Sequence, residues 1–177
     1  MFEFSSSLDG MPESKALKII RCPDRGQLEG MILNDSVTCH AMHYVAKRTV
    51  PHTENGPCQY CSPQNDFKLE VFVPIWNMMA DTKRILTLTD FAAQSLLQYA
   101  QDRGNLRGHI IKCWRPTQHK FGRIECQVYP IGELVSVCPP PVDVEKHLMM
   151  VWNVNMAELA NSSRQLPAGD NLANLRG

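Results

Sequence analysis

The chain has 177 residues with 18 basic and 18 acidic side chains, so its zero net charge argues against the strongly basic class of nucleic-acid-binding proteins. Its length suits one domain with tails, and no apolar stretch approaches the roughly 20 residues that a membrane-spanning helix needs. Seven cysteines, mostly scattered singly, argue against a disulfide framework, and residues 1–10 lack the pattern of a signal peptide, so we expect a protein of the reducing cytoplasm.

Most of the ordered chain is predicted to form β-strands. Residues 1–14 are polar and read as a flexible leader. Short segments of alternating or β-branched residues then predict strands at 16–22, 27–33, 37–46, 67–76, 84–88, 106–114 and 123–129, with a further one at 131–137. In the third of these, alternation places Cys39, Ala41 and His43 on one face. Pro74 in the fourth suggests an edge strand or a bulge.

The loop between the third and fourth strands carries the clearest chemical signal. Three histidines and three cysteines lie between residues 39 and 61, and two of the cysteines form a C-x-x-C pair in a Gly/Pro-rich turn. Two thiolates and two imidazoles are the ligands of a closed, tetrahedral structural zinc site. We therefore predict one zinc ion held by His43, His52, Cys58 and Cys61. Cys39 and His40 remain alternative ligands.

Two helices are predicted. Thr89 is a good N-cap, Asp90 suits a first helical turn and Gly104 ends the helix. Its expected apolar stripe consists of Phe91, Leu96, Leu97 and Ala100. Three prolines at 139–141 then interrupt the chain, and a short helix is expected between residues 143 and 159.

Several strands, a zinc loop, one inserted helix and a final hairpin are the element order of a small OB-like β-barrel. An SH3-like barrel or another small α+β sheet fits this order nearly as well. The predicted organisation is a leader at 1–14, a zinc-containing barrel at 15–138, a Pro-led linker with a short helix at 139–160, and a disordered tail at 161–177.

The charges gather in the body of the chain, because residues 15–125 carry fifteen basic against ten acidic side chains. Within residues 103–123, cations alternate with aromatic residues, and a strand would place Lys112 and Trp114 on one face. Single-stranded nucleic acid binds by phosphate neutralisation and base stacking, which this pattern could supply. The alternative without a function in binding is that Trp114 belongs to the core and that the basic hairpin is simply a solvated edge of the sheet. The predicted contacts are Arg107, Lys112, Trp114, Arg115, Lys120, Phe121 and Arg123, with Tyr44 and Arg48 beside the zinc loop.

Enzyme motifs are missing: there is no Walker A, GxGxxG, GxSxG or HExxH. The chain does contain P-C-x-x-C, and His52-x-Glu54 matches the H-x-E of zinc deaminases. The two elements are separated by only a few residues, whereas a deaminase carries them on separate helices. Zinc with four protein ligands also leaves no open position for water or substrate. We therefore predict a protein that is not an enzyme.

With these residues, the chain resembles the zinc-containing OB-fold single-stranded-DNA-binding proteins of phages and plasmids. In that family a histidine, a cysteine and a later C-x-x-C lie in a loop of the fold. His43, His52, Cys58 and Cys61 would take those roles here, a second histidine replacing a cysteine. The resemblance covers about residues 15–130 in architecture and only the loop in motif. The family's acidic C-terminal tail is missing, since residues 161–177 are nearly neutral.

The leading prediction is a zinc-stabilised module that binds single-stranded nucleic acid, DNA in preference to RNA, with low sequence specificity. The alternative is a protein–protein adaptor that docks a partner through the helix and the C-terminal apolar segment 148–152, which has no obvious place in a single barrel. Neither reading needs a membrane or a small-molecule substrate.

Overall fold

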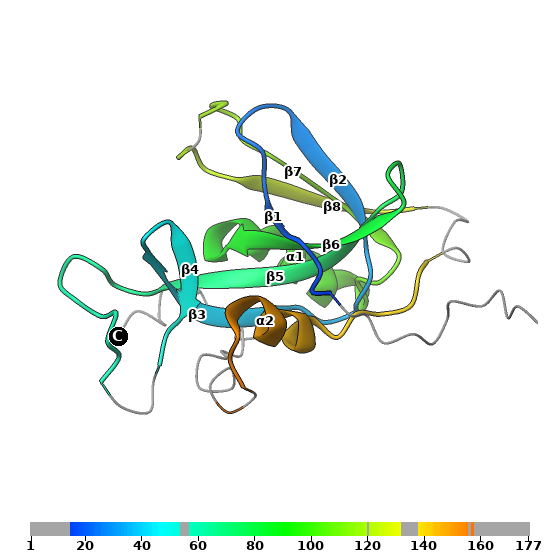
Figure 1. The fold of residues 1–177 in the computed structure, drawn as a ribbon. Helices are drawn as coiled ribbons and strands as arrows, with labels where there is room; N and C mark the ends of the chain where they lie inside the picture. Colours follow the sequence, from blue (N-terminus) through cyan, green and yellow to red (C-terminus); the bar gives the residue numbers. More distant parts are fainter. Residues whose placement is uncertain (1–14, 54–56, 120, 132–137, 156, 158–177) are drawn as a thin grey trace, which may run out of the picture.

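The computed structural model describes residues 15–53, 57–119, 121–131, 138–155 and 157. Within them the chain forms one mixed sheet of eight strands and two helices (Figure 1). The mainly β prediction is confirmed. The elements are β1 (Ile19–Arg21), β2 (Gln27–Ile32), β3 (Thr38–Val45), β4 (Arg48–Pro51), β5 (Lys68–Asn77), β6 (Thr82–Thr89), α1 (Asp90–Arg103), β7 (His109–Trp114), β8 (Glu125–Pro130) and α2 (Val144–Trp152).

Sequence analysis missed one strand. β4 lies within the segment that we interpreted as a loop, and it pairs back onto β3. The leader at 1–14, the tail at 161–177 and nearly all of the strand expected at 131–137 fall outside the described residues.

The long strand β5 organises the sheet. One of its edges pairs with β6 from Glu70 to Asn77, while the other pairs first with β3 and then with β2. β1 adds parallel to β6, and β2 continues through β7 to β8, so the order is β1-β6-β5-β2-β7-β8. The outer strands β1 and β8 are not paired with each other among the described residues. The sheet is therefore open, and the predicted OB-like barrel is not confirmed.

Pro74 lies in this central strand, not at an edge as we expected. Its carbonyl accepts a hydrogen bond of 2.9 Å from the backbone N–H of Leu33, on the side of β5 where pairing passes from β3 to β2. In an antiparallel strand the nitrogen and the carbonyl of one residue face the same side. The missing N–H of proline therefore falls at a break in the ladder, where no donor is required.

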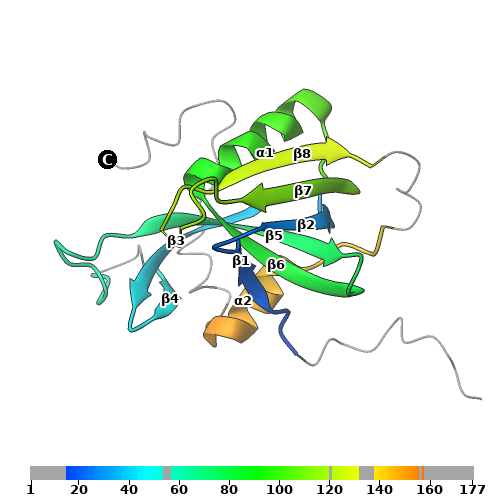
Figure 2. The ribbon, with the colours of Figure 1, turned by 90° about the horizontal axis from the view of Figure 1, so that it is seen from above.

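The central strands of the sheet are buried on both faces, and α1 and α2 cover opposite sides (Figure 2). Because side chains alternate along β5, Val71 and Val73 enter the core under α1 while Phe72 enters the core under α2. β3 shows the same alternation, since Cys39 and Ala41 join the first core and Met42 joins the second. This confirms the two faces predicted for that strand.

The ends of α1 are as predicted. The Thr89 hydroxyl accepts a 3.3 Å hydrogen bond from the Ala92 N–H, and Gly104 closes the helix at a positive φ of 79°. The predicted apolar stripe is only partly right. Leu96 is buried, but Phe91 is exposed and small alanines at 92 and 93 face the sheet instead, which lets the helix approach it closely.

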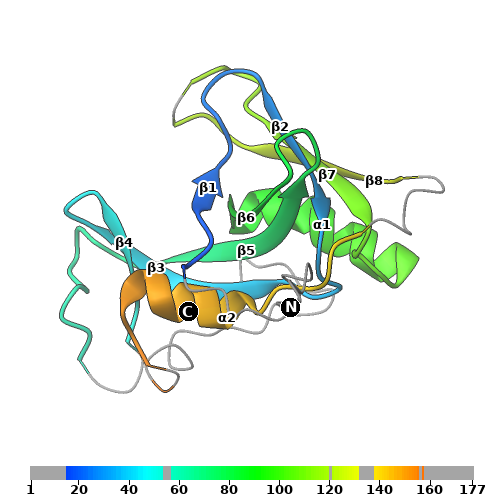
Figure 3. The same cartoon turned by 45° about the vertical axis from the view of Figure 1, so that its right-hand side comes forward.

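The segment before α2 is fastened to the sheet by polar contacts. The Asn34 side chain makes two hydrogen bonds with the Val142 backbone, at 2.7 and 2.8 Å. The Arg107 guanidinium donates to the carbonyl oxygens of Cys138 and Pro139. In Figure 3, α2 lies directly against the face of β3 and β5. The C-terminal apolar segment thus has a place on the sheet.

We expect Leu148→Ala to lower the free energy of unfolding by about 2–5 kcal/mol, because Leu148 is fully buried in the core under α2 and truncation leaves a cavity. Met150→Ala on the exposed side of the same helix should change it by less than about 0.5 kcal/mol. Urea denaturation of both variants measures the difference. Equal effects would mean that α2 does not belong to the folded unit.

Candidate metal centre

The β3–β4 hairpin positions the two histidines. His43 on β3 is buried and lies opposite Val50 of β4, and the backbone N–H of His52, just past β4, donates to the Ala41 carbonyl at 2.8 Å. The hairpin turns through Ala46 and Lys47, both at positive φ (49° and 66°). A two-residue turn of this kind matches the right-handed twist of the strands, although neither residue favours that conformation. The pairing of β3 with β4 and the turn between them together bring the imidazoles of His43 and His52 onto the same side of the hairpin.

A tight turn presents the two cysteines. The backbone N–H of Cys61 donates to the Cys58 carbonyl at 3.2 Å, and the Asn65 side chain donates to the Tyr60 carbonyl at 2.9 Å. This is the compact C-x-x-C turn that sequence analysis expected, and it holds both sulfurs toward the histidines.

The four predicted ligands come together. Nε2 of His43 lies 2.9 Å from Nδ1 of His52 and 3.5 Å from each of the Cys58 and Cys61 sulfurs, and all four ligand atoms lie within 4.8 Å of one another. Around a tetrahedral zinc ion, neighbouring ligand atoms are separated by about 3.3 Å for two nitrogens, about 3.6 Å for nitrogen and sulfur, and about 3.8 Å for two sulfurs. The donor set and spacing fit one structural zinc ion, as predicted.

The structure also decides between the alternative ligands. Cys39 is buried in the core under α1, and His40 lies on the opposite face, with its ring centroid 6.0 Å from those of Phe72 and Trp152. Neither belongs to the ligand cluster. An aromatic wall of the site was missed by sequence analysis: the Phe67 ring stacks on His52, with centroids 4.6 Å apart. The only indication in the sequence that Phe67 lies at the site was its position at the start of the strand that follows the loop.

At His43 and Cys58 the environment favours the protonation states that zinc requires, whereas burial and the neighbouring Cys58 raise the pKa of Cys61. Burial lowers the pKa of His43 and the charge of His52 lowers it further, while Asp66 and the backbone of Asn65 oppose the change, so the neutral imidazole is favoured. Burial raises the pKa of the Cys58 thiol, but hydrogen bonds from the backbone of Thr53, Tyr60 and Cys61 and from the Cys61 side chain outweigh it and lower the pKa overall. Neutral imidazole and thiolate are the forms that bind metal.

The residues predicted to contact nucleic acid differ in how far their side chains are exposed to solvent. Tyr44 is 61% exposed and Phe121 is 84% exposed, and Arg48 is exposed on β4. Lys112 and Trp114 share the outer face of β7 as expected, since Ile111 and Cys113 enter the core, but both are only half-exposed.

Three of the predicted arginines have intramolecular partners. Arg107 binds the two carbonyls before α2, Arg115 donates to the Gly122 carbonyl, and the Arg123 guanidinium lies 3.8 Å from the centre of the Phe91 ring. Lys120 falls outside the described residues. Among the described residues, the most exposed of the predicted contacts are therefore Tyr44 and Arg48 on the β3–β4 hairpin and Phe121 in the β7–β8 turn, so they do not share one continuous sheet face.

Comparison of the chain with protein-family models, with curated proteins and with solved structures found no match. No helix among the described residues is long and apolar enough to cross a membrane.

We expect elemental analysis to find one zinc ion per chain. Cys58→Ser and Cys61→Ser each remove a direct ligand, so each should weaken zinc binding by more than the roughly 10–100-fold that changes in the surrounding shell cost, and should lower the melting temperature. Cys138→Ser is the matched control, because Cys138 lies outside the cluster. A zinc-free purified protein whose melting is unchanged by chelator would contradict the site.

Acidification should release zinc and destabilise the fold together. The pKa of His43 is lower in the folded chain than its unfolded value of about 6.5. The contribution of neutral His43 to the stability of the fold is therefore complete at pH values above the unfolded pKa. It declines as the pH falls below the unfolded pKa, and it is lost once the pH is below the lowered folded pKa. Melting curves and a zinc-sensitive dye, read across one pH series, test this. Release of zinc without a fall in melting temperature would show that the ion does not stabilise the hairpin.

Proposed function

We propose that this zinc-stapled β domain binds single-stranded nucleic acid, DNA in preference to RNA, with low sequence specificity. The observation that carries the proposal is the β3–β4 hairpin. It presents the exposed ring of Tyr44 beside the cations of Lys47 and Arg48, and its two strands lead into the zinc ligands His43 and His52. Phosphates would meet the cations and a base would stack on the ring, which is worth about 1–3 kcal/mol per base.

The strand connections support an OB-like interpretation of the open sheet. β2 and β3 can be taken as one bent first strand, since both pair with β5, and α1 lies between β6 and the final hairpin β7–β8. OB-folds are partly open barrels that bind oligonucleotides with the loops between strands 1 and 2 and between strands 4 and 5. The corresponding segments here are the metal loop at 46–67 and the turn at 115–124.

The arrangement of these two segments agrees with a shared binding surface. Figures 1, 2 and 3 place the described parts of the metal loop and of the β7–β8 turn toward the same end of the sheet. The turn carries Phe121, the most exposed of the predicted aromatic contacts. We therefore centre the proposed contact on Tyr44, Lys47 and Arg48, with Phe121 at its far end, and assign Arg107 and Arg115 to the structure of the domain.

Zinc supplies rigidity in this proposal. A short hairpin is marginally stable alone, and two of its residues occupy unfavourable backbone conformations. Tying both strands to one ion keeps the ring and the cations in a fixed arrangement, which reduces the entropy lost on binding.

The adaptor function remains the second candidate, because α2 keeps apolar side chains on its outer side. Met150 and Val151 are each more than two-fifths exposed while the inner side of the helix packs on the sheet.

Fluorescence anisotropy with labelled oligothymidylate, in a salt series, tests the proposal. Binding should weaken as salt rises, since the cations displace counterions from the phosphates. Tyr44→Ala should weaken binding by about 5–150-fold, the equivalent of 1–3 kcal/mol per stacked base, and Arg48→Gln should reduce the salt slope by about one.

Arg103→Gln is the control, since it removes one positive charge from the exposed end of α1, away from the hairpin. No binding at low salt, or an equal effect of Arg103→Gln and Arg48→Gln, would refute the proposed contact.

A further inference from the structure

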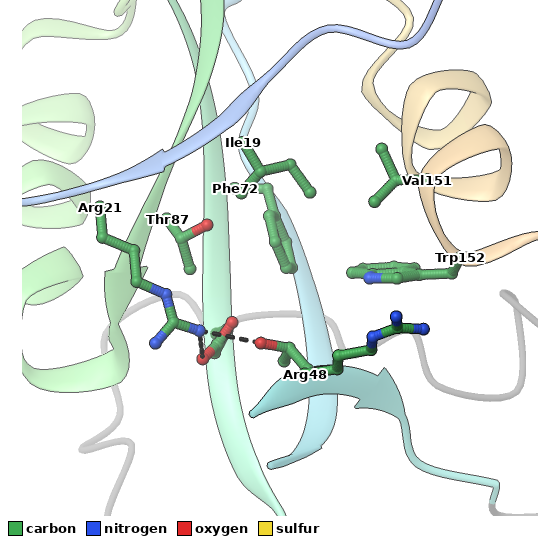
Figure 4. A pocket seen from close by; sticks show the side chains of 9 residues that line it. Ile19, Arg21, Arg48, Phe72, Thr87, Val151 and Trp152 are labelled. Carbon is green, nitrogen blue, oxygen red and sulfur yellow. Dashed lines mark hydrogen bonds and ion pairs between the residues drawn. The ribbon is translucent and has the colours of Figure 1, made fainter. Parts of the chain in front are cut away.

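We propose that a pocket between the sheet and α2 takes up one nucleotide of the bound strand, with its base against Trp152 and its phosphate at Arg48. The pocket has a volume of about 410 Å³, within the range of about 300–1,000 Å³ that is usual for small-ligand sites. Figure 4 shows it from close by. This inference rests on the proposed function and names a site that sequence analysis did not find.

The floor of the pocket is a row of neighbours across three strands. Arg21 of β1 lies opposite Thr87 of β6, and Thr87 lies opposite Phe72 of β5, so the three side chains share one face. α2 adds Val151 and Trp152 along one side, and β4 adds Arg48 along another (Figure 4). Thr49 of β4 also lines the pocket. No single segment of the chain encodes the site.

Thr87 points to a ligand. Its side chain is only 5% exposed, it lines the pocket, and its hydroxyl oxygen has no hydrogen-bond partner among the described residues. A buried hydroxyl without a partner destabilises the fold, because it has lost its hydrogen bonds to water. Valine has nearly the same shape and would avoid this cost, and buried polar groups in folded proteins usually have partners. A ligand group that bonds the hydroxyl would account for threonine at this position.

The polar wall of the pocket is held in place before any ligand arrives. The Arg21 guanidinium donates to Thr49 at 2.9 Å and pairs with Glu70 at 3.2 Å, which joins β1, β4 and β5. Burial raises the pKa of Glu70, and Arg21 and Lys68 oppose this change. Because the Arg21 guanidinium is already paired with the Glu70 carboxylate, Arg21 is not the group that would bind a phosphate.

Arg48 is the cation available to an anion. It is exposed, and no ion pair with a carboxylate is found for it among the described residues. Figure 4 places its guanidinium below the Trp152 ring. The Trp152 and Phe72 rings, 5.5 Å apart at their centroids, form an aromatic wall at the same side.

These features describe one class of ligand. A flat aromatic group fits the Trp152 wall, Thr87 can bond a polar edge of that group, and an attached anion would reach Arg48 at the mouth. A nucleobase with its phosphate combines all three. Arg48 and Thr49 belong to the hairpin that bears Tyr44, so the pocket continues the proposed nucleic-acid surface.

Thr87→Val tests the site, because it removes the hydroxyl and keeps the shape. We expect oligothymidylate binding to weaken about fivefold, the equivalent of one hydrogen bond of about 1 kcal/mol, while the melting temperature stays unchanged or rises. Thr82→Val, on the same strand but outside the pocket, is the matched control. Tryptophan fluorescence should be quenched by thymidine 5′-monophosphate in the native protein and not in Trp152→Phe.

The outcomes separate this inference from the proposed function. Oligonucleotide binding that depends on Tyr44 and Arg48 but is equal in Thr87→Val and Thr82→Val would overturn the pocket and leave the function standing. Quenching by the mononucleotide that is lost in Thr87→Val, without any oligonucleotide binding, would support the pocket and overturn the single-strand function. No response to either probe would overturn both.

Discussion

Strand β5 is the constraint on which the rest of this structure depends. It is paired on both edges and buried on both faces, so alternate residues supply two separate cores. A strand in that position needs apolar side chains at nearly every place, as in the run from Val71 to Ile75. The two cores in turn fix the two helices, α1 on one face and α2 on the other. Pro74 is compatible with this because its missing donor coincides with the change of partner from β3 to β2.

The zinc site stabilises the β3–β4 hairpin, which extends the sheet beyond the region that the apolar core stabilises. At the outer end of β3 the last buried side chain is His43, and β4 continues the sheet with only partly buried residues. Few apolar contacts are available there, so bonds to a metal take their place. The ligand cluster and the stacked Phe67 convert a short hairpin with an unfavourable turn into a fixed element. Exposed cations and Tyr44 on that element keep a defined position relative to the sheet.

The second helix connects the fold to the proposed recognition surface. Its inner residues complete the core under Phe72, while its last turn places Trp152 beside the hairpin and the Arg21–Glu70 ion pair. The C-terminal segment that motivated an adaptor function from sequence therefore has a structural role on the sheet. Its outer apolar side chains keep the adaptor function as the second candidate.

Local rules determined much of this protein from sequence alone. Alternation predicted the strands and the two faces of β3, because side-chain direction in a strand has a period of two residues. The caps of α1 at Thr89 and Gly104 and the four zinc ligands could also be predicted, since each depends on residues close together in the chain. Tertiary structure alone decided what depends on distant pairing. It placed Pro74 in a central strand, joined β4 to β3, left the sheet open between β1 and β8, and engaged Arg107 and Arg115 within the domain. The pocket at Thr87 brings together residues from β1 to α2, and no local pattern records which strands will become neighbours.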